Sequence, residues 1–196
     1  MDIKSTGCSE WHKWDLHIHT PYTWLCNQYG QNNDNTFVEK IVESKISAVG
    51  LTNYFSFHEN EIFASDSIRK KLIDKGIVVF PNLEFRLSYQ NKEGVLCDYH
   101  VIFSPDLPNE DIRSFLENLE IHIGRESKKA SKLTEEELRS NQLYVDVTNI
   151  QKAIDETRIR DSVMLGFMAD GKGESRSSGV SDSICAQSDF VIHSRN

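Results

Sequence analysis

Short apolar runs alternate along the chain with amphipathic helical patterns. The runs that predict strands are Trp14–His19, Ala48–Thr52, Ile77–Tyr89, Cys97–Ser104, Val163–Phe167 and Asp189–His193. The patterns that predict helices are Asn35–Ile46, Glu61–Lys75, Asn109–Glu120, Thr134–Ser140 and Asn149–Thr157. Gly76 is expected to end the second helix, and Pro81 to break the third strand. This alternation predicts an α/β protein with a largely parallel sheet, either open or closed into a barrel.

The composition is ordinary for a globular domain. The chain has 196 residues, of which 38% are apolar and 27% charged, and this length suits a single domain spanning residues 1–196. No run approaches the ~20 apolar residues of a membrane span, and the polar start of the chain shows no secretory signal. The four cysteines are widely spaced without a Cys-x-x-Cys pair, which is typical of reduced thiols. We therefore expect a cytoplasmic protein with no membrane association, and a loop at residues 169–179, which are rich in Gly and Ser.

The net charge of −8 argues against a simple nucleic-acid-binding protein, because such proteins usually carry a basic surface. It does not exclude a nuclease. A local cluster of metal ions can offset the charge of a phosphate even on an acidic protein.

Two histidines stand one residue apart in the first predicted strand, within the stretch KWDLHIHTPYTWL. Side chains alternate between the faces of a strand, so His17 and His19 are predicted to point the same way. Two imidazoles this close can share a metal ion, although two surface histidines on an amphipathic strand would show the same spacing.

Two further residues of metal-binding type lie on later strands. Glu84 is expected at the end of the third strand and His100 within the fourth. Taken alone, a strand histidine is more often a core residue and a glutamate a solvated one. In an α/β barrel, however, side chains at the strand ends converge on one face, and this set would suit Zn²⁺, Mn²⁺ or Fe²⁺.

Four stretches, taken in order, resemble the motifs of the PHP family, named for its polymerase and histidinol phosphatase members. They are DLHIHT (Asp15–Thr20), AVGLTNYF (Ala48–Phe55), FPNLEFRL (Phe80–Leu87) and YHVIFS (Tyr99–Ser104). The resemblance covers residues 11–125 well and the remainder loosely. The Trp-Asp-Leu-His opening and the FPN-x-E-x-R stretch are most similar to PHP domains fused to ABC/SMC-type ATPases in bacterial defence proteins. The resemblance implies a distorted (β/α)7 barrel that binds up to three metal ions and hydrolyses phosphate esters.

The resemblance also implies roles for single residues. It identifies four metal ligands: His17, His19, Glu84 and His100. Asp15 would hold a ligand imidazole by its other ring nitrogen. Arg86, two residues beyond Glu84 and on its face, would either meet a phosphate oxygen or form a structural salt bridge.

Three features depart from the family pattern. The second motif usually reads Thr-Asp-His, but Asn53 and Tyr54 stand here, and both are poor transition-metal ligands. We therefore expect one or two metal ions rather than three. The closing Asp-x-His is absent, since Asp189 and His193 are four residues apart, which spans ~13 Å along a strand. The barrel is thus expected to be incomplete at its C-terminal end. The sequence also has no G-x-x-x-x-G-K-[ST] phosphate loop, so an ATPase would be a separate region or subunit.

Two functional hypotheses follow. The first is a metal-dependent phosphoesterase, with nuclease activity as one form, acting on a phosphate ester or nucleic acid as the PHP module of an ATPase-linked anti-phage defence system. The second is a degenerate PHP module without catalysis that serves as a scaffold or regulatory domain for an ATPase partner. The four ligands favour the first hypothesis, whereas Asn53, Tyr54 and the missing closing motif favour the second.

Overall fold

The computed structural model describes residues 12–25, 27–29, 33–90, 96–168 and 184–192. The loop expected at residues 169–179 and the residue His193 lie outside this part of the chain.

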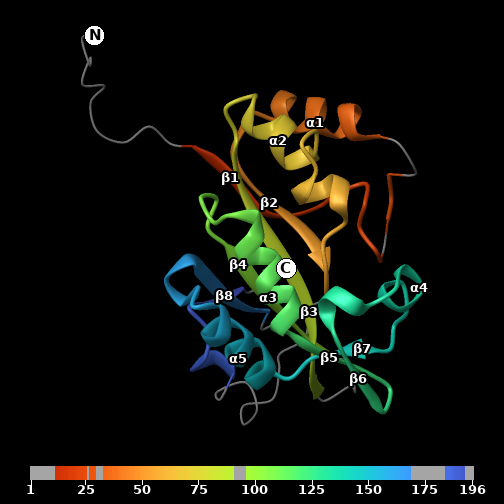
Figure 1. Ribbon diagram of the computed structural model, residues 1–196. Helices are drawn as coiled ribbons and strands as arrows, with labels where there is room; N and C mark the ends of the chain where they lie inside the picture. The colour runs from red at the N-terminus through yellow and green to blue at the C-terminus, as the bar shows by residue number, and fades with distance from the viewer. Residues whose placement is uncertain (1–11, 26, 30–32, 91–95, 169–183, 193–196) are drawn as a thin grey trace.

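A six-stranded sheet forms the centre of the molecule and curls into a half-barrel (Figure 1). In spatial order its strands are β1 (Lys13–His19), β2 (Ile46–Tyr54), β3 (Val78–Gln90), β4 (Leu96–Phe103), β8 (Val163–Met168) and β9 (Phe190–Ile192). The first three strands run parallel, as do β8 and β9, but β4 is antiparallel to both of its neighbours. The fold is therefore mixed α/β, and in the described residues the sheet is open between β1 and β9.

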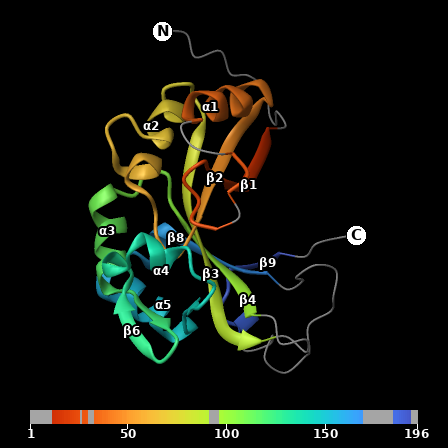
Figure 2. The same cartoon turned by 90° about the vertical axis from the view of Figure 1, so that its right-hand side faces the viewer.

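Helices cover one face of this sheet, and Figure 2 shows α2, α3 and α5 on the same side of it. The helical segments are α1 (Asp34–Glu43), η1 (Glu59–Phe63), α2 (Ile68–Ile73), α3 (Asn109–Asn118), η2 (Ala130–Lys132), α4 (Glu135–Leu138), α5 (Val147–Thr157) and η3 (Arg160–Ser162). Alternate residues of β3, including Val79, Leu83, Phe85 and Leu87, point into the core beneath the helices and are almost fully buried. This apolar layer holds the helices on the sheet.

A second, three-stranded sheet was not predicted. It has the order β6-β5-β7, with β5 at Glu120–Ile123, β6 at Glu126–Lys129 and β7 at Leu143–Tyr144. These strands are two to four residues long. β5 alternates polar and apolar residues (Glu-Ile-His-Ile) over only four positions, and β6 (Glu-Ser-Lys-Lys) has no apolar residue, so the sequence pattern is too short to predict the sheet.

Two elements differ from the predicted ones. The single helix expected at Glu61–Lys75 is divided into the π-helical turn η1 and the helix α2, because Ala64 is extended and Ser67 caps a new helix with its side chain. The strand β3 continues through Pro81. This proline pairs with β2, while pairing with β4 begins only at Asn82, so no ladder hydrogen bond is lost on that side.

The opposite face of the sheet is open. Val78 and Met164 are 44% and 39% exposed on this face, and the ring of Trp14 lies 6.3 Å from that of Phe80. Further along the same face, residues of β1, β3 and β4 become buried and polar. This buried polar region contains the predicted ligands.

None of the helices in the described part of the chain has the length and apolar character needed to cross a bilayer.

Candidate metal centre

A bulge in β1 turns the two histidines of the first motif toward the open face. The register with β2 shifts between Asp15 and Ile18, where two residues of β1 oppose the single residue Gly50. A Cβ atom on Gly50 would lie 1.9 Å from the carbonyl oxygen of Leu16, so only glycine allows this close approach. The bulge therefore depends on Gly50.

Three strands bring ligand atoms together at this place. The ligand atoms of His17, Glu84 and His100 all lie within 4.8 Å of one another. His19 is adjacent to them, because its Nε2 lies 3.3 Å from Nε2 of His17 and 3.5 Å from Oε2 of Glu84. Glu84 and His100 are direct partners across β3 and β4. Glu84 thus stands in the middle of β3, not at the end of the strand as the sequence suggested, and the antiparallel β4 carries His100 to it.

The protonation of His100 follows from the orientation of Asn82. The side-chain amide of Asn82 donates to the carbonyl oxygen of Leu16 at 2.9 Å, so its Oδ1 faces the other way and accepts from Nδ1 of His100 at 3.1 Å. The proton of the neutral imidazole therefore sits on Nδ1, and Nε2 offers a lone pair. Nε2 of His100 is buried and has no hydrogen-bond partner among the described residues.

Glu84 is similarly under-satisfied. Its Oε2 is buried 3.1 Å from Nε2 of His17, yet no hydrogen bond of acceptable geometry reaches it. A bare imidazole nitrogen and a bare carboxylate oxygen facing each other in a buried region are costly unless a cation lies between them. The donor set of three imidazoles and one carboxylate fits Zn²⁺, Mn²⁺ or Fe²⁺.

Burial controls the charges of these groups. It lowers the pKa of His100 to about 4 and also lowers the pKa of His19, so both imidazoles are neutral near pH 7. Burial acts in the same direction on His17, but the nearby carboxylate of Glu84 outweighs it and raises the pKa above its ordinary value. For Glu84, burial opposes ionisation, yet the three histidines keep the pKa below its ordinary value. Glu84 is therefore an anion and His100 a neutral ligand.

The two residues of the altered second motif point in opposite directions. The ring of Tyr54 stacks on that of His19, with centroids 5.0 Å apart, and its hydroxyl lies 3.5 Å from Nε2 of His19. Asn53 faces the helix side, where its amide nitrogen donates to Oε2 of Glu61 at 2.8 Å. The amide oxygen of Asn53 accepts from the backbone N–H of Trp24 at 3.0 Å. Tyr54 borders the metal centre, whereas Asn53 belongs to a structural network.

Glu61 is the centre of this network and is fully buried. Its carboxylate accepts hydrogen bonds from the hydroxyl of Thr20 at 2.7 Å and from the backbone N–H of His58 at 3.2 Å, besides that from Asn53. Burial nevertheless raises the pKa of Glu61 to about 7. The network ties the segment after β1 to the turn η1.

Asp15 and Arg86 lie at the margin of the centre. Oδ1 of Asp15 accepts from the backbone N–H of His17 at 3.2 Å, and the bulge places Asp15 opposite Val49, a core residue of β2. The carboxylate of Asp15 thus bonds to the backbone of its own strand, and its charge also contributes to the raised pKa of His17. The guanidinium of Arg86 lies 5.9 Å from the ring centroid of Tyr54 and donates to Oδ1 of Asn141 at 3.1 Å.

Asp189 forms a structural contact near the end of the sheet. It pairs with Arg160 at 2.7 Å and accepts from the backbone N–H of Leu165 at 2.8 Å. It holds β9 beside β8.

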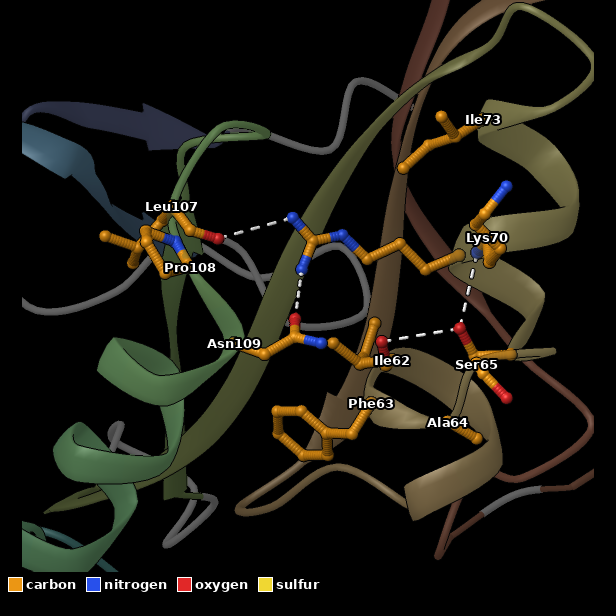
Figure 3. A pocket seen from close by; sticks show the side chains of 11 residues that line it. Ile62, Phe63, Ala64, Ser65, Lys70, Ile73, Leu107, Pro108 and Asn109 are labelled. Atoms are coloured by element: carbon orange, nitrogen blue, oxygen red, sulfur yellow. Dashed lines mark hydrogen bonds between the residues drawn. The ribbon is translucent and has the colours of Figure 1, made fainter.

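A hollow of about 470 Å³ lies away from this centre, between α2 and the start of α3 (Figure 3). Its buried cation, Arg69, donates to Oδ1 of Asn109 and to the carbonyl oxygen of Pro105, both at 2.7 Å. Arg69 thereby joins α2 to the β4–α3 connection, which is a structural role.

Asn82 is the functional residue that sequence reasoning missed. It stands two residues before Glu84, so the period of the strand already places both side chains on one face. That spacing was the available signal.

Comparison with models of protein families gave no match, and a search of curated proteins gave none either.

Proposed function

We propose that the chain is a metal-dependent phosphoesterase whose centre is formed by His17, His19, Glu84 and His100. The observation that carries the proposal is the pair of buried, unsatisfied ligand atoms, Nε2 of His100 and Oε2 of Glu84, aimed at the same place. A divalent cation held between the two atoms would explain why neither has a hydrogen-bond partner. We propose one or two such ions rather than three.

A metal ion held by these residues would polarise a phosphoryl oxygen and make a water more acidic. The residues of the chain contribute position and charge. Asn82 fixes the tautomer and ring plane of His100. Glu84 supplies the negative charge among the four residues, which favours retention of a cation.

Arg86 is proposed to bind the substrate phosphate. Its side chain is half-buried beside Tyr54, which itself stacks on His19, so the guanidinium lies at the edge of the centre. A guanidinium can donate two hydrogen bonds to a phosphate at once. Its hydrogen bond goes to the neutral Asn141, and Asp98 is its partner across β3 and β4.

The alternative is a module that binds metal without catalysis. The observation that favours it is Tyr54, which stands at the centre where the family pattern has a histidine. Involvement of an ABC/SMC-type ATPase and of an anti-phage system rests on the motif resemblance and forms part of the same proposal.

The test is hydrolysis of bis(4-nitrophenyl) phosphate by protein loaded with Zn²⁺, Mn²⁺ or Fe²⁺. The proposal expects activity that a chelator removes and that His100→Ala abolishes. His122→Ala is the matched control, because His122 pairs with Asp146 at 3.1 Å and stacks on Tyr144, away from the centre. Metal binding without hydrolysis by any loaded form would favour the non-catalytic alternative.

A further inference from the structure

A hollow of about 280 Å³, bounded in part by the segment that follows His19, is lined largely by aromatic and charged side chains. We call it the aromatic pocket. Its lining includes Tyr22, Trp24, Asn27, His58, Glu135 and Arg139. The rings of Tyr22 and His58 are stacked, with centroids 4.4 Å apart and planes 8° from parallel. The guanidinium of Arg139 lies 5.4 Å from the ring centroid of Trp24.

Two sets of contacts join the aromatic pocket to the metal centre. Thr23 lies between Tyr22 and Trp24 in the chain, and its hydroxyl is 3.4 Å from Nδ1 of His19. On the other side, Asn141 follows Arg139 by two residues and accepts from Arg86, which lies beside Tyr54. Residues next to the pocket lining therefore contact both His19 and Arg86.

The walls of the pocket are held in place without a ligand. The indole N–H of Trp24 donates to the carbonyl oxygen of Ser56 at 2.7 Å, and its backbone N–H is held by Asn53. The hydroxyl of Tyr22 donates to Asp34 at 3.1 Å. A preformed pocket binds more tightly, because less side-chain entropy is lost on binding.

The chemistry of the pocket indicates a planar, uncharged ring. Aromatic rings and a guanidinium all stack on nucleobases, and such stacking accepts any base because every base has a π-face. Arg139 and Glu135 can donate to and accept from the edge of a base. Arg139 and Glu135 are 3.9 Å apart, so their opposite charges offset each other in the pocket. The volume is at the lower end for ligand sites, which suits one ring system rather than an extended molecule.

We propose that the aromatic pocket binds a nucleobase of the substrate whose phosphate lies at the metal centre. The substrate class would then be a nucleotide or nucleic acid rather than a sugar phosphate. This inference rests on the proposed phosphoesterase function for the position of the phosphate, but base binding can be measured without hydrolysis.

The test compares the affinities of adenosine 5′-monophosphate and ribose 5-phosphate for the full chain by titration calorimetry. The two probes share the phosphate and the sugar and differ by the base. We expect the nucleotide to bind at least about tenfold more tightly than ribose 5-phosphate, because stacking of one base contributes a gain in affinity of this size. Equal affinities, or no binding of either probe, would overturn it.

Variants assign the preference to the pocket. Arg139→Ala and His58→Asn should reduce the advantage of the nucleotide to less than about threefold. Asparagine at position 58 keeps an acceptor for the cap of η1 while removing the ring. Arg113→Ala is the matched control, since Arg113 is an equally exposed arginine, 4.0 Å above the ring centroid of Phe63 and outside the pocket. An equal loss in Arg113→Ala would overturn the assignment.

His100→Ala separates this inference from the function on which it rests. The variant should weaken both probes but leave the preference for the nucleotide. If wild-type protein prefers the nucleotide yet hydrolyses no diester, the base site stands and the catalytic proposal fails.

Discussion

A Cβ atom on Gly50 would lie 1.9 Å from the carbonyl oxygen of Leu16, in the bulge that carries His17. Gly50→Ala must therefore displace the backbone of β1. We expect a loss of about 1–3 kcal/mol in the free energy of unfolding, as for other overpacked sites. We also expect weaker metal binding, because His17 moves with the bulge.

Gly124→Ala is the control for this change. Gly124 has a φ of 60°, so alanine there is strained as well, but the turn lies in the small second sheet. It should lower the stability and keep the metal affinity. Equal metal affinities of Gly50→Ala and wild type in an equilibrium competition with a chelator would contradict the role given to the bulge.

Asn82→Ala removes the acceptor that holds Nδ1 of His100. The metal affinity should fall by roughly 10- to 100-fold, as for other partners of metal-bound histidines. Asn149→Ala, which removes an amide that donates to the carbonyl oxygen of Glu120, should leave the affinity unchanged. Competition with a fluorescent zinc chelator measures both. An unchanged affinity in Asn82→Ala would show that His100 needs no such support.

Glu61 should make the protein less stable as the pH rises. Its pKa is raised from 4.5 to about 7 in the folded chain, so at low pH the carboxyl is protonated in both states and its burial carries no ionic cost. Between about pH 4.5 and 7 the unfolded chain releases the proton first, and up to about 3 kcal/mol of stability is lost. Above pH 7 the loss is complete.

Glu61→Gln resembles the protonated acid, since its amide can donate to Thr20 and its oxygen can accept from Asn53 and His58. The difference in stability between variant and wild type should therefore grow in favour of the variant from pH 5 to pH 8. Urea unfolding at a series of pH values measures it. A difference independent of pH would contradict the raised pKa.

Asn53 and Tyr54 should respond differently to substitution toward the Thr-Asp-His sequence. Tyr54→His adds an imidazole beside His19 and should raise the metal stoichiometry. Asn53→Asp places a carboxylate against Glu61 and removes a donor from it, so it should cost about 3 kcal/mol of stability without adding metal. Metal analysis and thermal unfolding of each single variant distinguish the two. More metal in Asn53→Asp would show that position 53 faces the centre.

Strand spacing alone places His17 and His19 on one face, whereas Glu84 and His100 were predicted as ligands from the resemblance of their stretches to family motifs. His17 and His19 are two apart and Glu84 is aligned with His100 across neighbouring strands, so the four converge once the sheet forms. Strand spacing does not predict the contacts of Asp15 in the same way. The bulge that sets the register of Asp15 depends on Gly50, a residue of another strand, and no local sequence pattern indicates it.

The local sequence pattern also could not predict which face of the sheet Asn53 occupies. In sequence it is the neighbour of Tyr54 within a motif, but its partner Glu61 is buried in a π-helical turn that the sequence indicated as ordinary helix. The sequence predicted a largely parallel sheet, but β4 is antiparallel to its neighbours, because an apolar run does not indicate the direction in which a strand runs. In each case the decisive contact comes from elsewhere in the chain.

The central claim is that His17, His19, Glu84 and His100 hold a metal ion. The most direct test is the metal content of the purified chain after exposure to Zn²⁺, Mn²⁺ and Fe²⁺ and removal of the unbound ions, compared with that of His100→Ala and His122→Ala. The account predicts about one to two equivalents in wild type and in His122→Ala, and a loss of most of the metal in His100→Ala without unfolding. Wild-type protein with less than ~0.2 equivalents of every metal, or His100→Ala with undiminished content, would contradict it.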